Sequence, residues 1–315
     1  MKKKILLSIS SPDKDFDNLI SVLKKQAEVT VAGLYDYSLE GIDIFIGKSM
    51  PTDKLKSADR LKAVFAYKTG VDGFPVDQLC SMNVMMCNSH INSEYIAQYA
   101  FSLALAITAR IAEFDRKMRR GDWDINNPYW KNLFDMKVGI VGYGSIGRAI
   151  DKVLRANGIP TYTIDRGKDY GDIALVPSLE ELCKTTDLLM LALPQTTQTD
   201  KMFDEHIFNL LRGKYIVNVG RSNCIDEKAL YNALKNRLLA GAAIDTWRQK
   251  PSPDSPILKP FDYPFDELDN IVLSSHKAMQ VYDGHGRYVK DTLDNVLLYL
   301  SGQTPKNIVD LKKGY

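Results

Sequence analysis

The stretch Met136–Arg166, MKVGIVGYGSIGRAIDKVLRANGIPTYTIDR, decides the fold of this chain. The apolar run Val138–Val141 predicts a strand, and it leads into the glycine-rich turn Gly142–Gly147. Apolar residues at helical spacing follow, and a second run of alternating apolar residues, Thr161–Ile164, ends on Asp165. A strand, a glycine turn, a helix, a second strand and a terminal acid together make up a βαβ unit of the type that binds dinucleotides.

Each part of this unit has a physical role in holding a dinucleotide. Gly142 permits the tight turn, Gly144 lets the backbone approach a pyrophosphate, and Gly147 lets the helix pack closely on the strand. The start of the helix offers unpaired N–H groups and the positive end of the helix dipole to the phosphates. Asp165 can accept hydrogen bonds from both ribose hydroxyls of NAD and would repel the 2′-phosphate of NADP, so the sequence favours NAD.

The bulk composition favours two domains and argues against a nucleic-acid partner. The 315 residues suffice for two substantial cores, and the net charge is only +2. The basic cluster within Arg116–Arg120 is interpreted as the solvated end of a helix. The cysteines show no metal-binding spacing and lie in or beside apolar runs, which predicts reduced, buried thiols, no metal site and a cytoplasmic location. They are Cys80, Cys87, Cys183 and Cys224.

Neither of the two apolar segments that could suggest a membrane partner has the required length. The N-terminal run Ile5–Ile9 is too short for a signal peptide and is interpreted as a first strand. The run Tyr95–Ala109 is shorter than the roughly 20 residues that a membrane-spanning helix needs. We therefore expect a soluble protein.

Alternating strand and helix patterns predict an α/β fold with two doubly wound parallel-sheet domains. Short apolar runs predict the strands of the first domain: Ile5–Ile9, Val29–Ala32, Ile42–Ile46, Ala63–Ala66 and Val84–Cys87. After Asp165 the alternation resumes and predicts a sheet of about six or seven strands. The larger, Rossmann dinucleotide-binding domain (93–295) is thus expected to be inserted into a smaller, flavodoxin-like substrate domain (1–92 and 296–315), with the active site in the cleft between them.

A long apolar helix is expected to begin at Asn92 or Ser93 and to run through Ile107, with a continuation to Arg119 left open. Because apolar residues surround this helix on nearly every side, it is buried either within one molecule or between two. A homodimer interface is the preferred interpretation.

Three predicted strand ends place polar groups at the carboxyl edge of the larger sheet. Arg221 follows the strand Tyr215–Val219 and can either bind a carboxylate through two parallel hydrogen bonds or cap the strand at the surface. Asp245 ends an apolar strand, where it can lie near the nicotinamide and can also cap the next turn. His276 follows Ile271–Leu273, where a proton donor to a carbonyl would be needed, although a structural histidine fits the position equally well.

Together these residues resemble the D-isomer-specific 2-hydroxyacid dehydrogenase family, which includes D-lactate, D-glycerate and phosphoglycerate dehydrogenases and glyoxylate/hydroxypyruvate reductases. The resemblance covers nearly the whole chain and is strongest over residues 136–276. Besides the glycine turn it is carried, in order, by Thr69-Gly70-Val71-Asp72, Leu193-Pro194 with Thr199, Val219-Gly220-Arg221, Ala243-Ile244-Asp245 and Ser274-Ser275-His276.

The resemblance implies an oxidoreductase that transfers hydride between NAD(H), with NADP less favoured, and a small 2-keto or D-2-hydroxy acid. Arg221 would bind the substrate carboxylate and polarise the keto oxygen, and His276 would exchange the proton. The N–H groups of Thr69 and Gly70 would hold the carboxylate. The residues implied to line the cofactor are Gly142, Gly144, Ser145, Ile146, Gly147, Asp165, Leu193, Pro194, Thr199, Val219, Gly220 and Asp245.

Lys250 is the main departure from the family pattern. The family places a glutamate five residues after the aspartate to hydrogen-bond the catalytic histidine, and this sequence has Lys250 at that position, before Pro251. A carboxylate beside an imidazole favours its protonated form, whereas an ammonium group disfavours it. The resemblance therefore leaves an alternative, a non-catalytic NAD(H)-binding sensor or interaction protein on the same fold.

Overall fold

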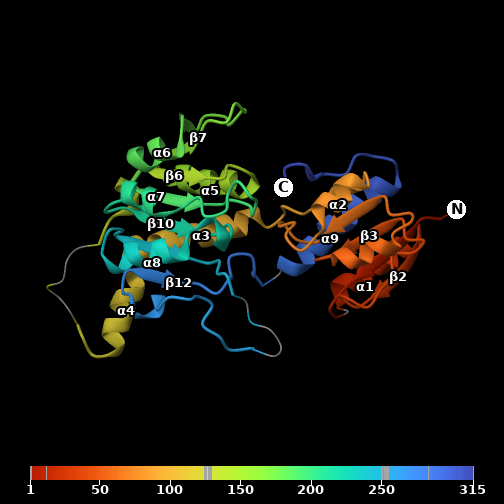
Figure 1. Cartoon of the computed structure of the whole chain (residues 1–315), viewed down its shortest axis with the longest axis horizontal. Helices are drawn as coiled ribbons and strands as arrows, with labels where there is room; N and C mark the ends of the chain where they lie inside the picture. The colour runs from red at the N-terminus through yellow and green to blue at the C-terminus, as the bar shows by residue number, and fades with distance from the viewer. Residues whose placement is uncertain are drawn as a thin grey trace. The chain divides into compact units, whose positions relative to one another are not determined.

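The computed structural model describes residues 2–11, 13–123, 126, 130–249, 251, 255–282 and 284–314. The chain forms two compact units, both of which are α/β (Figure 1). Unit 1 consists of Met1–Asn92 with Val281–Tyr315, and unit 2 consists of Ser93–Gln280.

The described part of unit 1 contains one parallel sheet of five strands in the order β2-β1-β3-β4-β5. This is the flavodoxin-like order, so the predicted fold of the smaller domain is confirmed. The strands are β1 (Lys4–Ser8), β2 (Glu28–Ala32), β3 (Ile44–Gly47), β4 (Ala63–Ala66) and β5 (Met85–Cys87). The helical segments are α1 (Lys14–Lys24), η1 (Thr52–Ser57), α2 (Val76–Ser81) and α9 (Gly284–Leu300).

The return of the chain to unit 1 begins earlier than the predicted boundary at residue 296. That position lies inside α9, which packs against α1 and β4. The buried side chains of α9 include Tyr288, Val289, Leu293 and Val296, so the same helix contributes to one core on both sides of the predicted boundary. Because a continuous helix packs as one body, residues 281–295 belong to unit 1.

The described part of unit 2 contains a parallel sheet of seven strands in the order β12-β11-β10-β9-β6-β7-β8. The strand order reverses between β6 and β9, and ligands of such sheets bind at the carboxyl ends of the strands beside this reversal. The strands are β6 (Val138–Val141), β7 (Thr161–Ile164), β8 (Ala174–Val176), β9 (Leu188–Leu191), β10 (Tyr215–Asn218), β11 (Gly241–Ile244) and β12 (Ile271–Leu273).

Helices cover both faces of this sheet. One hydrophobic cluster joins the sheet to α3 (Ser93–Thr108) and α5 (Ser145–Ala156). A second cluster, on the other face, contains the buried side chains of α6 (Leu179–Thr185), α7 (Glu205–Leu210) and α8 (Glu227–Lys235). The remaining helical segments of unit 2 are α4 (Ile111–Arg119), η2 (Leu133–Asp135), η3 (Ser222–Cys224) and η4 (Phe265–Glu267).

The apolar helix α3 is buried within its own unit. Its residues Ile96, Ala100, Leu103 and Ile107 belong to the cluster shared with α5 and the sheet, so the chain itself covers this face. Among the described residues no single helix is long and apolar enough to cross a membrane, and α3 meets that test only jointly with α4, across a 60° bend. Arg110 lies at the break between the two helices and has a φ of +56°.

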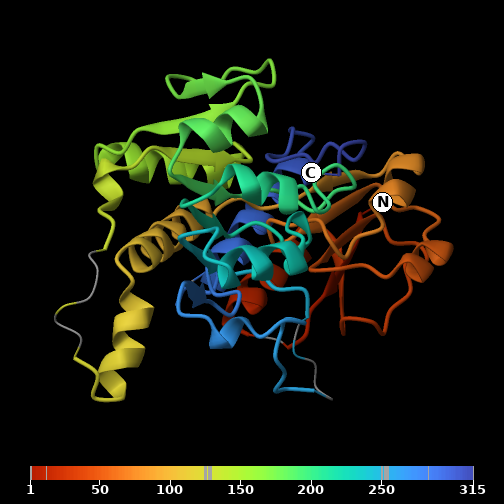
Figure 2. The ribbon, with the colours of Figure 1, turned by 60° about the vertical axis from the view of Figure 1, so that its left-hand side comes forward.

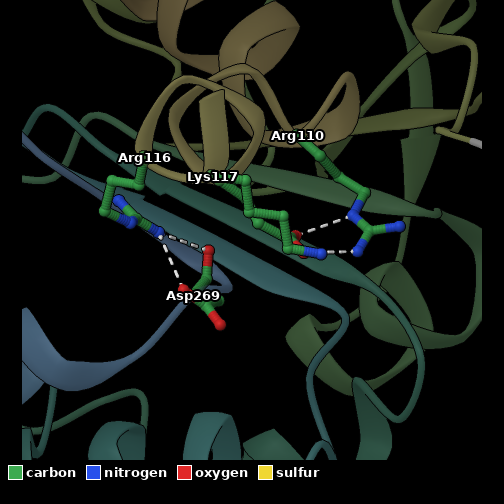
Figure 3. Close-up of polar contacts among 5 residues, drawn as sticks. Arg110, Arg116, Lys117 and Asp269 are labelled. Carbon is green, nitrogen blue, oxygen red and sulfur yellow. Dashed lines mark hydrogen bonds and ion pairs between the residues drawn. The ribbon is translucent and has the colours of Figure 1, made fainter. Parts of the chain in front are cut away.

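The short helix α4 extends from the rest of unit 2 (Figure 2) and is held by ion pairs (Figure 3). Arg110 and Lys117 contact the carboxylate of Glu113 at 2.6 and 3.3 Å, and Arg116 reaches Asp269 at 3.5 Å. Burial alone would raise the pKa of the Glu113 carboxyl, but the hydrogen bonds from Arg110 and Lys117 outweigh it and lower this pKa. These basic side chains therefore pair with acids of their own unit.

All four cysteines are free thiols. Cys87, Cys183 and Cys224 are buried, as predicted, whereas Cys80 is half-buried. Burial raises the pKa of the Cys87 and Cys183 thiols to about 12. In the described part of the chain no group of three or more histidine, cysteine or acidic side chains could hold a metal ion.

Candidate functional site

The glycine turn between β6 and α5 requires glycine at two positions. Gly142 has a φ of +96°, and a Cβ there would lie 2.7 Å from the carbonyl oxygen of Ala192. A Cβ on Gly147 would lie 2.2 Å from the carbonyl oxygen of Gly142. Because backbone atoms occupy the space in both cases, neither position can take a side chain without moving the turn.

Gly144 differs from these two glycines because it faces open space. It is the N-cap of α5, and no heavy atom lies within 4 Å of the position that a Cβ would take. No side chain caps this helix, so the first N–H groups, including those of Ser145 and Ile146, have no side-chain acceptor. Free N–H donors, the positive end of the helix dipole and an open approach suit a pyrophosphate, so the residues present fit the phosphates of a dinucleotide.

Asp165 lies at the end of β7 with an exposed side chain. One carboxylate oxygen accepts the N–H of Gly167 at 2.8 Å, and the Asp165 N–H donates to the carbonyl of Val176 at 2.8 Å. These bonds fix the turn that carries the acid. An ionised carboxylate has about four acceptor sites, so Asp165 retains capacity for the hydroxyls of a ribose.

The loops after β9 and β10 touch each other at Leu193 and Gly220. A Cβ on Gly220 would lie 2.7 Å from both the N and the O atoms of Leu193, so only glycine permits this approach. The buried Asn218 shapes the second loop, since its Oδ1 accepts the N–H of Gly220 at 2.9 Å and its Nδ2 donates to the carbonyl of Arg221 at 3.1 Å. Val219, between them, is buried.

The hydroxyl of Thr199 is used within its own loop. It donates to the carbonyl of Pro194 at 2.8 Å and accepts the N–H of Thr196 at 3.0 Å. Thr199 is also buried, so it shapes the loop that begins at Pro194 rather than presenting its hydroxyl at the surface.

Arg221, Asp245 and His276 follow the neighbouring strands β10, β11 and β12. These strands are parallel, so their carboxyl ends lie at the same edge of the sheet. Arg221 is half-buried, and its Nη1 donates to the carbonyl of Gly220 at 2.9 Å. The guanidinium is therefore held by the turn that contains Arg221, while part of the side chain is exposed to solvent.

Asp245 is fully buried and holds the loop that carries His276. One carboxylate oxygen accepts the hydroxyl of Ser274 and, at 2.8 Å, the N–H of Lys277; the other accepts the N–H of Ala278 at 3.1 Å. The main-chain carbonyl of Asp245 accepts the N–H of His276 at 2.9 Å. Of the two roles considered for this aspartate, capping the turn is the one that these contacts define.

His276 adopts a backbone conformation that is rare for a residue with a side chain. Its φ is +57°, in the left-handed region, and its ring is half-buried. Such conformations persist where the surrounding structure fixes them, and they concentrate at functional sites. The bonds from Asp245 on either side of the histidine supply that constraint. Lys250 lies outside the described residues.

In unit 1, the loop Thr69–Asp72 follows β4 and is tied at several points. Asn88 Nδ2 donates to the carbonyl of Thr69 at 2.6 Å, and the Thr69 hydroxyl is hydrogen-bonded to Tyr288 at 3.0 Å. The Lys68 ammonium donates to the carbonyl of Asp72 at 2.5 Å. The N–H groups of Thr69 and Gly70 make no hydrogen bond to any residue that the structure describes.

Two residues that shape the site were missed in the sequence. Asn218 is an amide in an otherwise apolar strand, and Ser274 follows another strand, beside the histidine. A buried polar side chain at a strand end needs partners, so the isolated Asn in Val217-Asn218-Val219 was the available signal. Nothing in the local pattern marks the bond from Ser274 to Asp245.

Comparison with known proteins identifies the family. Residues 101–278 match the family described as "D-isomer specific 2-hydroxyacid dehydrogenase, NAD binding domain". A glyoxylate reductase from Korarchaeum cryptofilum is 31% identical over 267 residues, which cover 81% of this chain and 78% of that protein. The chain belongs to the D-isomer specific 2-hydroxyacid dehydrogenases. It is thus an NAD(P)-dependent 2-hydroxyacid dehydrogenase.

Solved structures of this dehydrogenase fold align over almost the full length of the chain. A protein from Pyrococcus horikoshii aligns with a TM-score of 0.85 at 25% identity, covering 98% of this chain and 96% of that one. An NADPH-dependent glyoxylate/hydroxypyruvate reductase from Sinorhizobium meliloti, solved with NADP and malonate, shares the fold with a TM-score of 0.81 at 21% identity. That alignment covers 99% of this chain and 98% of the other.

The two glycines of the turn should respond differently to alanine. Gly144→Ala has room for its Cβ, so we expect an unchanged melting temperature and a loss of NADH affinity of tenfold or more, because the methyl enters the space needed by the pyrophosphate. Gly147→Ala should lower both stability and affinity, since its Cβ meets the Gly142 carbonyl. Thermal unfolding and NADH fluorescence titration measure both effects. An unchanged NADH affinity in Gly144→Ala would contradict the assigned phosphate position.

Proposed function

We propose that this dehydrogenase reduces a small 2-keto acid to the D-2-hydroxy acid with NADH, and catalyses the reverse oxidation. The observation that carries the proposal is the placement of Arg221 and His276 at the same edge of one sheet, after β10 and β12. The strand between them, β11, ends on the buried Asp245, which holds the histidine loop. A fixed cation for a carboxylate and a proton donor for a carbonyl oxygen are what this reduction needs.

In the proposed mechanism the guanidinium of Arg221 pairs with the substrate carboxylate and hydrogen-bonds the keto oxygen. NADH, when bound, supplies the hydride that is added to the keto carbon. The negative charge that develops on the oxygen is stabilised by Arg221. The protonated imidazole of His276 then gives its proton to this oxygen and becomes neutral, and in the oxidation it accepts the proton again.

Thr69 and Gly70 of unit 1 are proposed as further ligands of the substrate carboxylate. Their N–H groups donate to no described residue, and the loop is held in place by Asn88 and Tyr288. Two fixed backbone donors side by side can bind one carboxylate without reorganisation.

NAD is the proposed cofactor, with NADP less favoured. The exposed carboxylate of Asp165 follows β7, where the family pattern places the acid that contacts the ribose, and it would repel a 2′-phosphate. Arg166, which is also exposed, is the neighbouring group that could partly offset this repulsion. The reductase from Sinorhizobium meliloti is NADPH-dependent, whereas a D-lactate dehydrogenase of the same fold from Aquifex aeolicus was solved with NAD, so the fold itself admits both cofactors.

A homodimer is also proposed. The sequence suggested the helix that starts near Asn92 as its interface, and we propose instead a contact surface formed by α4 and the described apolar residues that follow it. The inner face of α3 is covered within unit 2, whereas several large apolar side chains of the neighbouring segment are exposed. These are Ile111, Met118, Trp123, Trp130 and Phe134. Exposed apolar residues gathered along one segment are typical of an interface.

The central test is NADH oxidation at 340 nm with glyoxylate, hydroxypyruvate, pyruvate and bulkier 2-keto acids, repeated with NADPH. We expect turnover with at least one acid and a clear preference for NADH. Arg221→Ala should lower kcat/KM by on the order of 100-fold or more, as loss of a donor to a developing oxyanion does, with unchanged NADH affinity. Arg212→Ala, an exposed arginine, is the matched control. Saturable NADH binding without oxidation by any acid would instead support the non-catalytic sensor.

Replacing Lys250 by glutamate tests the departure from the family pattern. Reduction requires protonated His276, so its rate falls as pH rises and the imidazole loses its proton. A carboxylate beside the ring stabilises the protonated form, so Lys250→Glu should turn over faster and remain active to higher pH. Lys62→Glu makes the same charge change at an exposed position of unit 1. Identical pH profiles for Lys250→Glu and the wild type would mean that residue 250 does not act on His276.

The dimer is tested by light scattering in solution. We expect the wild type to have twice the mass of one chain, and the double variant Trp123→Ser/Trp130→Ser to shift towards the monomer, because it removes two large exposed apolar surfaces from the proposed contact. Tyr35→Ser, at another exposed aromatic residue, should leave the mass unchanged. A monomeric wild type would exclude the proposal.

A further inference from the structure

A chain of hydrogen bonds leads from helix α3 to the loop that carries His276. The Tyr99 hydroxyl lies 2.8 Å from Ser274 Oγ, and Ser274 Oγ donates to the carboxylate of Asp245. A serine hydroxyl has one proton, and an ionised carboxylate can only accept. The proton of Ser274 is therefore used on Asp245, and Tyr99 must be the donor to Ser274.

Ser274 is fixed through every polar group that it has. Its N–H donates to the carbonyl of Ile244 at 2.9 Å, and its carbonyl accepts the indole N–H of Trp247 at 2.8 Å. Its hydroxyl is held between Tyr99 and Asp245, and the residue is buried. Ser274 thus joins three parts of unit 2: helix α3, the segment after β11 and the end of β12.

The position of Tyr99 on a packed helix fixes the hydroxyl that it presents to Ser274. It lies on α3, packed against the hydrophobic cluster that joins this helix to α5 and the sheet. The bond that it makes crosses 175 positions of sequence, so it ties the histidine loop to the core of the unit rather than to its own neighbours. A donor to Ser274 Oγ also polarises the bond from Ser274 to Asp245, because hydrogen bonds in a chain strengthen one another.

The loop that carries His276 is held at the end of this chain by its backbone. His276 has a φ of +57°, and Asp245 makes three bonds around it. The His276 N–H donates to the Asp245 carbonyl, and the N–H groups of Lys277 and Ala278 donate to its carboxylate. A shift of the Asp245 carboxylate would therefore move the loop that carries the imidazole.

We propose that Tyr99 is a positioning residue for the reaction, which orients Asp245 through Ser274 and thereby holds in place the loop that carries the His276 imidazole. The inference rests on the proposed function, in which His276 transfers the proton. It predicts that loss of the Tyr99 hydroxyl impairs the chemical step and leaves the binding of cofactor and substrate carboxylate intact.

The test compares Tyr99→Phe, Ser274→Ala and Ser274→Thr with the wild type in the full chain. Tyr99→Phe keeps the ring and removes only the hydroxyl, so kcat for 2-keto acid reduction should fall about five- to tenfold, while KM and the NADH dissociation constant stay within about twofold. Ser274→Ala should lose at least as much. Ser274→Thr keeps a hydroxyl at this position and should retain kcat within about twofold.

A double-mutant cycle separates positioning from a general effect on stability. Tyr99 and Ser274 act in one chain, so Tyr99→Phe/Ser274→Ala should be no slower than Ser274→Ala alone. Tyr162→Phe removes the hydroxyl of a half-buried tyrosine of β7 and serves as the matched control, with unchanged kcat.

The outcomes distinguish this inference from the proposed function. A wild type that binds NADH but reduces no 2-keto acid would overturn both. An active wild type with an unchanged kcat in Tyr99→Phe, additive losses in the double variant, or an equal loss of NADH affinity and melting temperature would overturn the positioning role alone.

Discussion

The buried carboxylate of Asp245 is the constraint on which the loops at the carboxyl ends of β11 and β12 depend. A charged group without solvent must be satisfied by the protein, and this one receives the hydroxyl of Ser274 and the N–H groups of Lys277 and Ala278. The same requirement shapes the loop, because the backbone must curl around the acid to supply these donors. The left-handed conformation of His276 is a consequence of that curl.

The glycine-rich turn at the same edge of the sheet depends on steric space rather than on charge. Gly142, Gly147 and Gly220 lie where a Cβ would meet backbone atoms, so glycine at these positions lets the turn, the helix and two loops approach one another. Gly144 leaves its surroundings open at the uncapped start of α5. The resulting site combines a rigid backbone with free N–H donors, an arrangement suited to phosphate.

The glycine turn and the Asp245 loop both follow strands of one parallel sheet. Its strands place the glycine turn after β6, Asp165 after β7, and Arg221, Asp245 and His276 after β10, β11 and β12. Because all strands run in the same direction, residues from six separated parts of the sequence, including the loop after β9, gather at one edge. The family match over residues 101–278 covers all of this set.

Local patterns in the sequence were sufficient to predict the βαβ unit, the parallel sheets and the residues at the strand ends, because strand, turn and helix each depend on neighbours within a few positions. The local pattern did not predict that the chain re-enters unit 1 at Val281 or that helix α3 ends before Arg110. Both depend on which hydrophobic core a helix packs against. Only the tertiary structure shows which groups Asp245 binds and that Tyr99 and Ser274 form a chain of hydrogen bonds to it. Those contacts join residues far apart in the chain and form only when helix α3 has packed on the sheet. A local sequence pattern therefore cannot predict them.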